Sequence, residues 1–85
     1  PEYSIIETSV PEGITGKTLM ESELRSKFGV NVIAIRKRVP VITDSGEPDF
    51  IVEWNVSPLP DDRMEEGDIL VMVGNNEALN KFKKG

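Results

Sequence analysis

The residues best suited to chemistry lie between positions 18 and 31, in the run TLMESELRSKFGVN. Arg25 stands among apolar neighbours in this run, and Asn31 brings a side-chain amide just after Gly29. An arginine keeps its charge and can form two parallel hydrogen bonds to phosphate or carboxylate oxygens. An amide can donate to the same group. The run therefore predicts a small pocket at a helix–strand junction, which binds an anionic and partly apolar ligand without transforming it.

The composition argues against an enzyme. The chain has no histidine and no cysteine, which removes the commonest general base, thiolate nucleophiles and zinc–sulfur sites. No serine therefore has a histidine to activate it. The acidic segment 61–68 leaves two interpretations open, a hard-cation site built from carboxylates or a solvated turn. Its spacing lacks the glycine and bidentate glutamate of a calcium loop, which favours the turn.

Length and charge limit the class of protein and its partners. Eighty-five residues are enough for one domain, covering positions 1–85. The net charge is −5 and the longest cationic run is only residues 36–38, so we expect no nucleic-acid partner. No apolar run is long enough to insert into a bilayer, and no signal peptide is visible. Because the chain starts at Pro1, we expect a cytoplasmic domain excised from a longer protein.

A helix is predicted from Thr18 to Phe28. Thr18 and Glu21 have the spacing of a capping box, in which each side chain bonds a backbone N–H at the helix start. Gly29 can take the left-handed conformation that ends a helix. Apolar residues recur at intervals of four and predict one apolar stripe: Met20, Leu24 and Phe28.

The other elements predict an α+β fold with a mainly antiparallel sheet. Strands are expected at 4–10, 30–35, 50–54 and 69–73, with a last helix from Asn76. The order is strand, helix, strand, strand, strand, helix, with both helices on one face. Residues 39–48 read as an edge and a turn, because Pro40 cannot donate to a central ladder. Alternation in the third strand predicts that Phe50, Val52 and Trp54 point inward. Trp54 is expected to belong to the core.

Two short helices cannot cover both faces of this sheet. The strands at 30–35 and 69–73 are apolar on both faces, so their second faces would be left in water. Exposed apolar patches of several hundred Å² usually mark interfaces, and we therefore expect a homodimer.

Three segments in this order resemble one family: GKTLMESELRSKFGVNVIAIRK, SPLPDDRMEEGDILVMVG and NEALNKF. The chain is similar to the TrkA-C domain, the C-terminal half of the RCK regulators of potassium channels and transporters. The resemblance covers most of the chain. It departs from the family at residues 39–54, which are longer than the family's usual short hairpin.

The resemblance implies a regulatory module with no resident cofactor. Such domains form homodimers, follow an N-terminal nucleotide-binding RCK domain, and act on the cytoplasmic side of a membrane potassium channel or transporter. In part of the family the dimer interface binds cyclic di-AMP. The family's phosphate-contacting arginine and the asparagine six residues later correspond to Arg25 and Asn31. The family's apolar residues around the adenines correspond to Leu19, Met20, Leu24 and Val30. The proline of its facing segment corresponds to Pro58.

Two alternatives remain at this stage. Arg25 could simply pair with Glu21 on the helix surface, which would stabilise the helix by a few tenths of a kcal/mol. The domain could also dimerise as a purely structural part of its regulator, with no ligand of its own.

Overall fold

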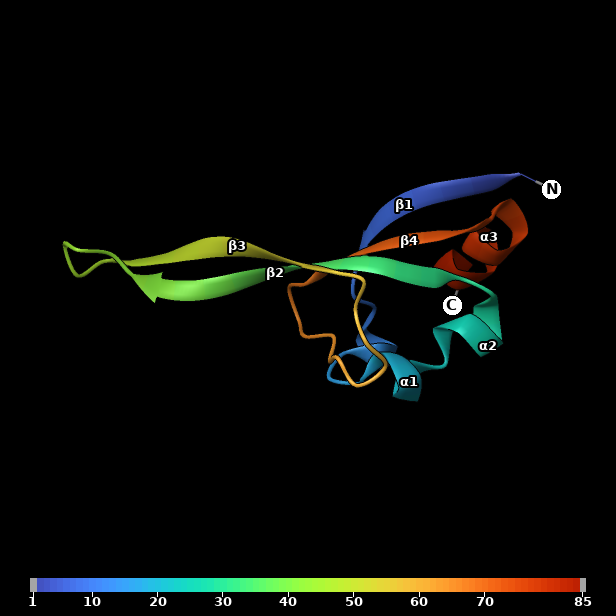
Figure 1. Cartoon of the computed structure of the whole chain (residues 1–85), viewed down its shortest axis with the longest axis horizontal. Helices are drawn as coiled ribbons and strands as arrows, with labels where there is room; N and C mark the ends of the chain where they lie inside the picture. Colours follow the sequence, from blue (N-terminus) through green and yellow to red (C-terminus); the bar gives the residue numbers. More distant parts are fainter. Residues whose placement is uncertain (1, 85) are drawn as a thin grey trace.

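A four-stranded sheet with helices on one face makes up the chain, in a computed structural model that describes residues 2–84. The elements are β1 (Tyr3–Ser9), the 3-10 turn η1 (Glu12–Ile14), α1 (Leu19–Ser22), α2 (Leu24–Phe28), β2 (Asn31–Ile42), β3 (Pro48–Val56), β4 (Ile69–Asn75) and α3 (Asn76–Lys84). Figure 1 shows their arrangement.

The sheet is antiparallel throughout, with the strand order β1-β4-β2-β3. β4 therefore lies between the first and second strands of the chain, and β1 and β3 form the two edges. A bulge between Val32 and Ala34 shifts the register of β2 against β4. The predicted α+β fold with an antiparallel sheet is confirmed.

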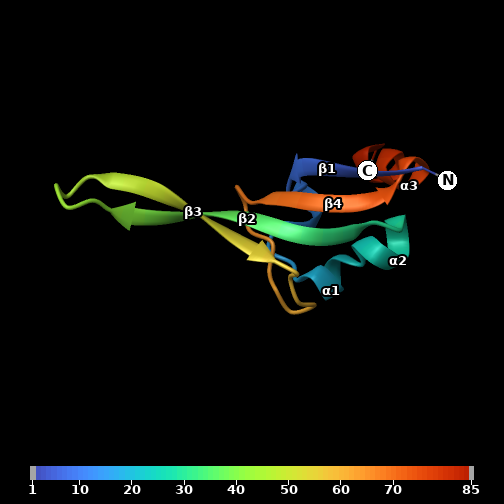
Figure 2. The same cartoon turned by 45° about the horizontal axis from the view of Figure 1, so that its top comes forward.

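The core lies between the sheet and the helices. Ile35, Leu70 and Met72 project from the sheet and are fully buried. α2 and α3 cover these side chains. Phe28 of α2 and Phe82 of α3 meet edge to face, with ring centroids 5.7 Å apart. Figure 2 shows α1 and α2 beside the first half of β2, with α3 next to β4. The helices share one face of the sheet, as predicted.

The predicted first helix is broken in two. The capping box at its start is present, since Thr18 N–H donates to Glu21 Oε1 at 2.9 Å and Glu21 N–H to Thr18 Oγ1 at 3.1 Å. Glu23, however, has φ 54°, which ends α1 and starts α2 in a new direction. The prediction that Met20 and Leu24 belong to one stripe is wrong, because the break separates them: Leu24 is buried, whereas Met20 is 68% exposed.

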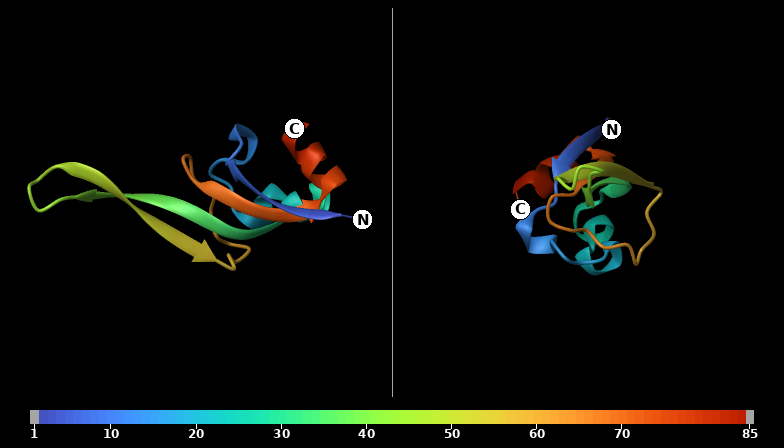
Figure 3. Two further views of the ribbon diagram at one scale, coloured as in Figure 1. Left: turned by 90° about the horizontal axis from the view of Figure 1, so that it is seen from above. Right: turned by 90° about the vertical axis from the view of Figure 1, so that its left-hand side faces the viewer.

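A long hairpin extends from the body of the domain. β4 pairs with β2 only as far as Arg36, whereas the pairing of β2 with β3 continues from Ala34 to Ile42. Residues 37–55 therefore form a two-stranded arm, which Figure 3 shows as a separate projection. The molecule measures 52 × 24 × 23 Å, and its radius of gyration is 14.4 Å, against about 12 Å for a compact chain of this length.

This arm corrects two predictions. The strand expected to end at residue 35 continues through Pro40. Beyond Arg36 only β3 pairs with β2, so Pro40 lies in an edge strand, where a residue without an N–H is tolerated. Phe50, Val52 and Trp54 do share one face, but placing them in the core is wrong, because each is more than half exposed. No helix reaches far enough to cover them.

The second face of the body is also open. Tyr3, Ile5 and Ile33 are exposed there, as expected for a sheet covered on one side. The homodimer inferred from this feature stays a prediction. Within the described residues, no helix is long and apolar enough to cross a membrane.

Candidate ligand-binding site

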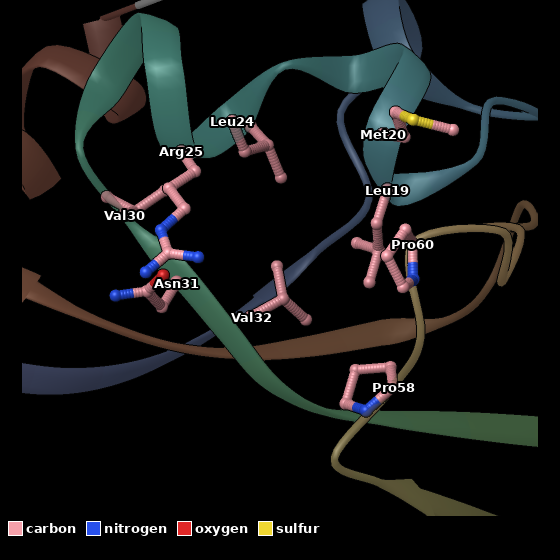
Figure 4. Close-up of a pocket in the computed structure, with 9 residues that line it drawn as sticks. All are labelled: Leu19, Met20, Leu24, Arg25, Val30, Asn31, Val32, Pro58 and Pro60. Atoms are coloured by element: carbon pink, nitrogen blue, oxygen red, sulfur yellow. The ribbon is translucent and has the colours of Figure 1, made fainter.

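A cavity of about 340 Å³ opens where α1, α2, the start of β2 and the loop after β3 meet. Figure 4 shows its lining: Leu19, Met20, Leu24, Arg25, Val30, Asn31, Val32, Pro58 and Pro60. The lining includes all seven residues that the family resemblance implied as ligand-binding residues. Their contact with a ligand stays a prediction.

Two lining residues, Val32 and Pro60, were missed. Each lies two positions after a predicted residue, Val30 or Pro58; for Val32, which enters β2, residues two apart point to the same side of the strand. That spacing could have found Val32, whereas the turn that contains Pro60 gives no such periodicity.

The break at Glu23 gives the pocket its shape. Because α2 starts anew at Leu24, this side chain enters the core while the next residue, Arg25, reaches the rim. Gly29, with φ 75°, then ends α2 and sends the chain directly into β2, so that Asn31 lies near the guanidinium (Figure 4). The cation and the amide lie at one end of the cavity, and the two prolines at the other.

The charge of Arg25 is available to a ligand. Within residues 2–84 its side chain takes part in none of the ion pairs or hydrogen bonds of the structure. Glu21 bonds the Thr18 N–H and lies 3.8 Å from Arg63 instead. The Thr18 N–H that donates to this carboxylate lowers the pKa of Glu21, and the Thr18 hydroxyl adds to the effect. The alternative in which Arg25 pairs with Glu21 is therefore wrong.

The proline wall is fixed by the loop that carries it. Asp62 Oδ2 accepts hydrogen bonds from Asn55 Nδ2 at 2.9 Å and from Leu59 N–H at 2.7 Å, and these bonds lower its pKa. The loop is also bonded to α1, because Met20 N–H donates to the Pro60 carbonyl at 3.0 Å. The cavity is thus formed before any ligand arrives.

The acidic segment acts as part of this scaffold. Among the described residues no three carboxylates converge closely enough to hold a metal ion. Asp68 is buried and accepts from Lys37 Nζ at 2.6 Å and from Glu65 N–H at 2.9 Å. It therefore ties the base of the arm to the loop that leads into β4.

Two curated relatives are potassium uptake proteins. The chain is 29% identical over 83 residues to Ktr system potassium uptake protein C of Bacillus subtilis (strain 168), covering 98% of this chain and 32% of that protein. It is 26% identical over 82 residues to Ktr system potassium uptake protein A of the same organism, covering 96% and 31%. The chain therefore spans about a third of the length of these relatives.

Solved structures share the fold. One is the RCK C domain of the potassium transport protein KtrA in complex with cyclic diadenosine monophosphate, with TM-score 0.72, 32% identity and coverage of 98% of this chain and 82% of that one. Another is the GsuK channel bound to NAD, with TM-score 0.73, 26% identity and coverage of 96% and 13%. The family model of the TrkA-C domain matches residues 5–84, and the chain belongs to that family.

Proposed function

We propose that this chain is a regulatory module of a potassium uptake system, which binds an anionic purine ligand such as cyclic di-AMP in the cavity between α1, α2 and β2. The observation that carries the proposal is the position of Arg25, a cation without an ionic partner in the described residues at the rim of an apolar cavity. A solved relative at 32% identity is a complex with cyclic diadenosine monophosphate, which supports this choice of ligand.

The lining suits the two chemical parts of such a ligand. Arg25 can form paired hydrogen bonds to a phosphate, and the Asn31 amide can donate to the same group. Leu24, Val32 and the prolines offer aliphatic surface on which a purine ring can pack. The cavity suits one nucleotide half, so that a second copy would hold the other half of a symmetrical dinucleotide.

Regulation would follow from the charge of this site. Two Arg25 side chains that face each other across a two-fold axis repel until an anion lies between them. A ligand with two phosphates removes the repulsion and stabilises the closed dimer, because it binds that state more tightly. The preceding RCK domain would pass this change to a membrane potassium transporter, a partner supported by the Ktr relatives.

Calorimetry with cyclic di-AMP tests the site. We expect Arg25→Gln to weaken binding by about 10- to 100-fold, the effect of losing charge-assisted hydrogen bonds to phosphate. Lys27→Gln is the matched control, because this cation lies on the same helix but outside the cavity, 3.3 Å from Glu23. The control should bind as the unchanged chain does.

Two outcomes would contradict the proposal. If the unchanged chain binds no cyclic di-AMP at millimolar concentration while it still dimerises, the domain serves only as a structural dimerisation module. If Arg25→Gln and Lys27→Gln weaken binding equally, the affinity depends on the overall charge of the chain, and the ligand does not bind in the cavity. Cyclic di-GMP in the same titration tests whether the site distinguishes adenine from guanine.

A further inference from the structure

A single loop forms one wall of the cavity and also holds the base of the arm. This loop, residues 57–68, runs from the end of β3 past α1 to the start of β4 (Figure 1). It carries Pro58 and Pro60, which line the cavity. Two arm residues that lie outside the cavity lining, Lys37 and Asn55, are hydrogen-bonded to the same loop. The ligand site and the arm therefore share one structural element.

Each strand of the arm has its own bond to the loop. From β3, Asn55 Nδ2 donates to Asp62 Oδ2 at 2.9 Å. From β2, Lys37 Nζ donates to the Arg63 carbonyl at 3.1 Å and to the buried carboxylate of Asp68 at 2.6 Å. Asp62 and Arg63 are adjacent, so both strands are held at one point of the loop. A two-stranded hairpin is only marginally stable by itself, so these bonds matter more to the arm than they would to a packed strand.

The same part of the loop is bonded to the cavity. The Asp62 carbonyl accepts from Leu19 N–H at 3.0 Å, and the Pro60 carbonyl accepts from Met20 N–H at 3.0 Å. Leu19, Met20 and Pro60 all line the cavity. A ligand that packs against these residues therefore restrains the segment 60–62, and through it the atoms to which the arm is bonded.

The junction between the arm and the loop is strained. Ser57 has φ 57°, a left-handed conformation that disfavours residues with a side chain, and the proline that follows restricts it further. Asp62 accepts hydrogen bonds from Asn55, two positions before this residue, and from Leu59 N–H, two positions after it. A strained conformation persists only while its surroundings hold it. We therefore expect two arrangements of the junction: a joined one, in which these bonds are made, and a released one, in which the backbone at Ser57 relaxes.

We propose that Asn55 and Lys37 couple the cavity to the arm, so that a bound ligand holds the arm in the joined arrangement. This inference rests on the proposed function and adds how occupancy of the site reaches another part of the chain. A ligand can pack on Pro58 and Pro60 only while the loop is in place. It therefore binds the joined arrangement more tightly and raises its population.

Amide hydrogen exchange with and without cyclic di-AMP tests this coupling. At a fixed protein concentration, saturating ligand should slow exchange at 24–31, beside the cavity, and also at 49–54 in the arm. We expect a slowing of about fivefold or more in the arm, the lower end of typical couplings between sites. β1, which pairs only with β4, is the internal reference and should not change.

Asn55→Ala removes the bond from β3, with Glu53→Ala as its matched control. The two residues lie on the same strand and, being two apart, on the same face. Within residues 2–84, Glu53 takes part in none of the ion pairs of the structure and none of the bonds to the loop. At saturating ligand, Asn55→Ala should keep the slowing at 24–31 but reduce that at 49–54 to within about twofold, because the arm is uncoupled. Glu53→Ala should behave as the unchanged chain does.

A second variant removes the bonds from β2 without leaving a lone buried charge. Lys37→Met alone would leave the carboxylate of Asp68 buried and unpaired, so it is combined with Asp68→Asn. An amide oxygen at position 68 can still accept from Glu65 N–H, a bond of 2.9 Å in this structure. This double variant should also reduce the slowing at 49–54, because the two strands of the arm are paired with each other. Circular dichroism checks that it folds.

The strain at Ser57 gives a test that needs no ligand. Glycine adopts the left-handed conformation freely, so Ser57→Gly should favour the joined arrangement. Ser57→Ala keeps the strain and is the matched control, since the Ser57 hydroxyl makes none of the bonds that hold the loop to the arm. Without ligand, amides at 49–54 should exchange about two- to fivefold more slowly in Ser57→Gly than in Ser57→Ala.

The outcomes distinguish this coupling from the proposed function. Slowing at 24–31 with none at 49–54 would overturn the coupling and leave the function intact. Slowing at 49–54 that persists in both Asn55→Ala and the double variant would also overturn it. No slowing at either segment would contradict the proposed function. In that case the comparison of Ser57→Gly with Ser57→Ala still decides the link between loop and arm, because equal exchange at 49–54 would show that the joined and released arrangements do not exist.

Discussion

One carboxylate holds the wall of the cavity opposite Arg25. Asp62 accepts hydrogen bonds from the Asn55 amide and the Leu59 N–H, which lie on either side of Pro58. An ionised carboxylate is an acceptor at both oxygens, and hydrogen bonds to it are stronger than those to a neutral group. Protonation of Asp62 therefore weakens the attachment of the loop that carries both prolines.

The sign of the pH dependence follows from the lowered pKa of Asp62, caused first by the Asn55 hydrogen bond and then by the Leu59 N–H. A carboxyl group whose pKa falls on folding adds stability above its ordinary value of 3.8, and this stability is lost as the pH falls through the lower, folded value. We expect Asp62→Asn to lower the urea midpoint at pH 7. The difference from the unchanged chain should shrink as the pH falls below 3.8.

Asp61→Asn is the control for this experiment, because its exposed side chain makes none of the hydrogen bonds described for Asp62. It should unfold at the same urea concentration as the unchanged chain at both pH values. An Asp62→Asn midpoint that differs from the unchanged chain equally at pH 7 and pH 3 would show that the carboxylate charge plays no part in holding the loop.

At the scale of the element, the break between α1 and α2 depends on a strained residue. Glu23 has φ 54°, a left-handed conformation that costs a side-chain-bearing residue roughly 1–2 kcal/mol. The strain persists because α1 is bonded to the loop, through Leu19 N–H to the Asp62 carbonyl at 3.0 Å, while α2 packs on α3. The surrounding contacts thus hold Glu23 in a backbone conformation that its own preference disfavours, and this conformation sets the different directions of α1 and α2.

Glycine at this position should relieve the strain. We expect Glu23→Gly to raise the free energy of unfolding by about 0.5–1 kcal/mol, after the loss of the exposed ion pair with Lys27, worth a few tenths of a kcal/mol. Glu23→Ala loses the same ion pair but keeps the strain, so it should be slightly less stable than the unchanged chain. Urea unfolding of both variants measures the difference, and a Gly variant no more stable than the Ala variant would contradict the strain.

Sequence patterns predicted those elements whose signals are local. The capping box of Thr18 and Glu21 and the stop at Gly29 depend on neighbours within one helical turn, and both are present. The break at Glu23 was missed because glutamate is a good helix former and the cause is contact with a loop about 40 residues later.

The same distinction explains the site and the arm. The cavity residues could be predicted because they lie at one junction or match the family's motif. The exposure of Trp54 could not, because alternation along a strand shows which residues share a face but not whether anything covers that face. Here the answer depends on where β4 begins, because its first residue, Ile69, lies opposite Arg36 and no part of β4 runs beside the arm.

At the scale of the whole molecule, a packed body carries an arm with no core of its own. Lys37 joins the two parts, since its Nζ bonds Asp68 Oδ2 at 2.6 Å and the Arg63 carbonyl at 3.1 Å. The buried residues Ile35, Leu70 and Met72 all lie in the body. Local stability should therefore fall sharply along β2 and β3 beyond that lysine, because opening the arm exposes little buried surface.

Amide hydrogen exchange measures this gradient. In dilute solution, amides at 49–54 of β3 should exchange at least about tenfold faster than those of β4, because they open without unfolding the body. If residues 49–54 were as protected as β4 in dilute solution, the arm would be stable by itself, and the body and the arm would unfold as one unit.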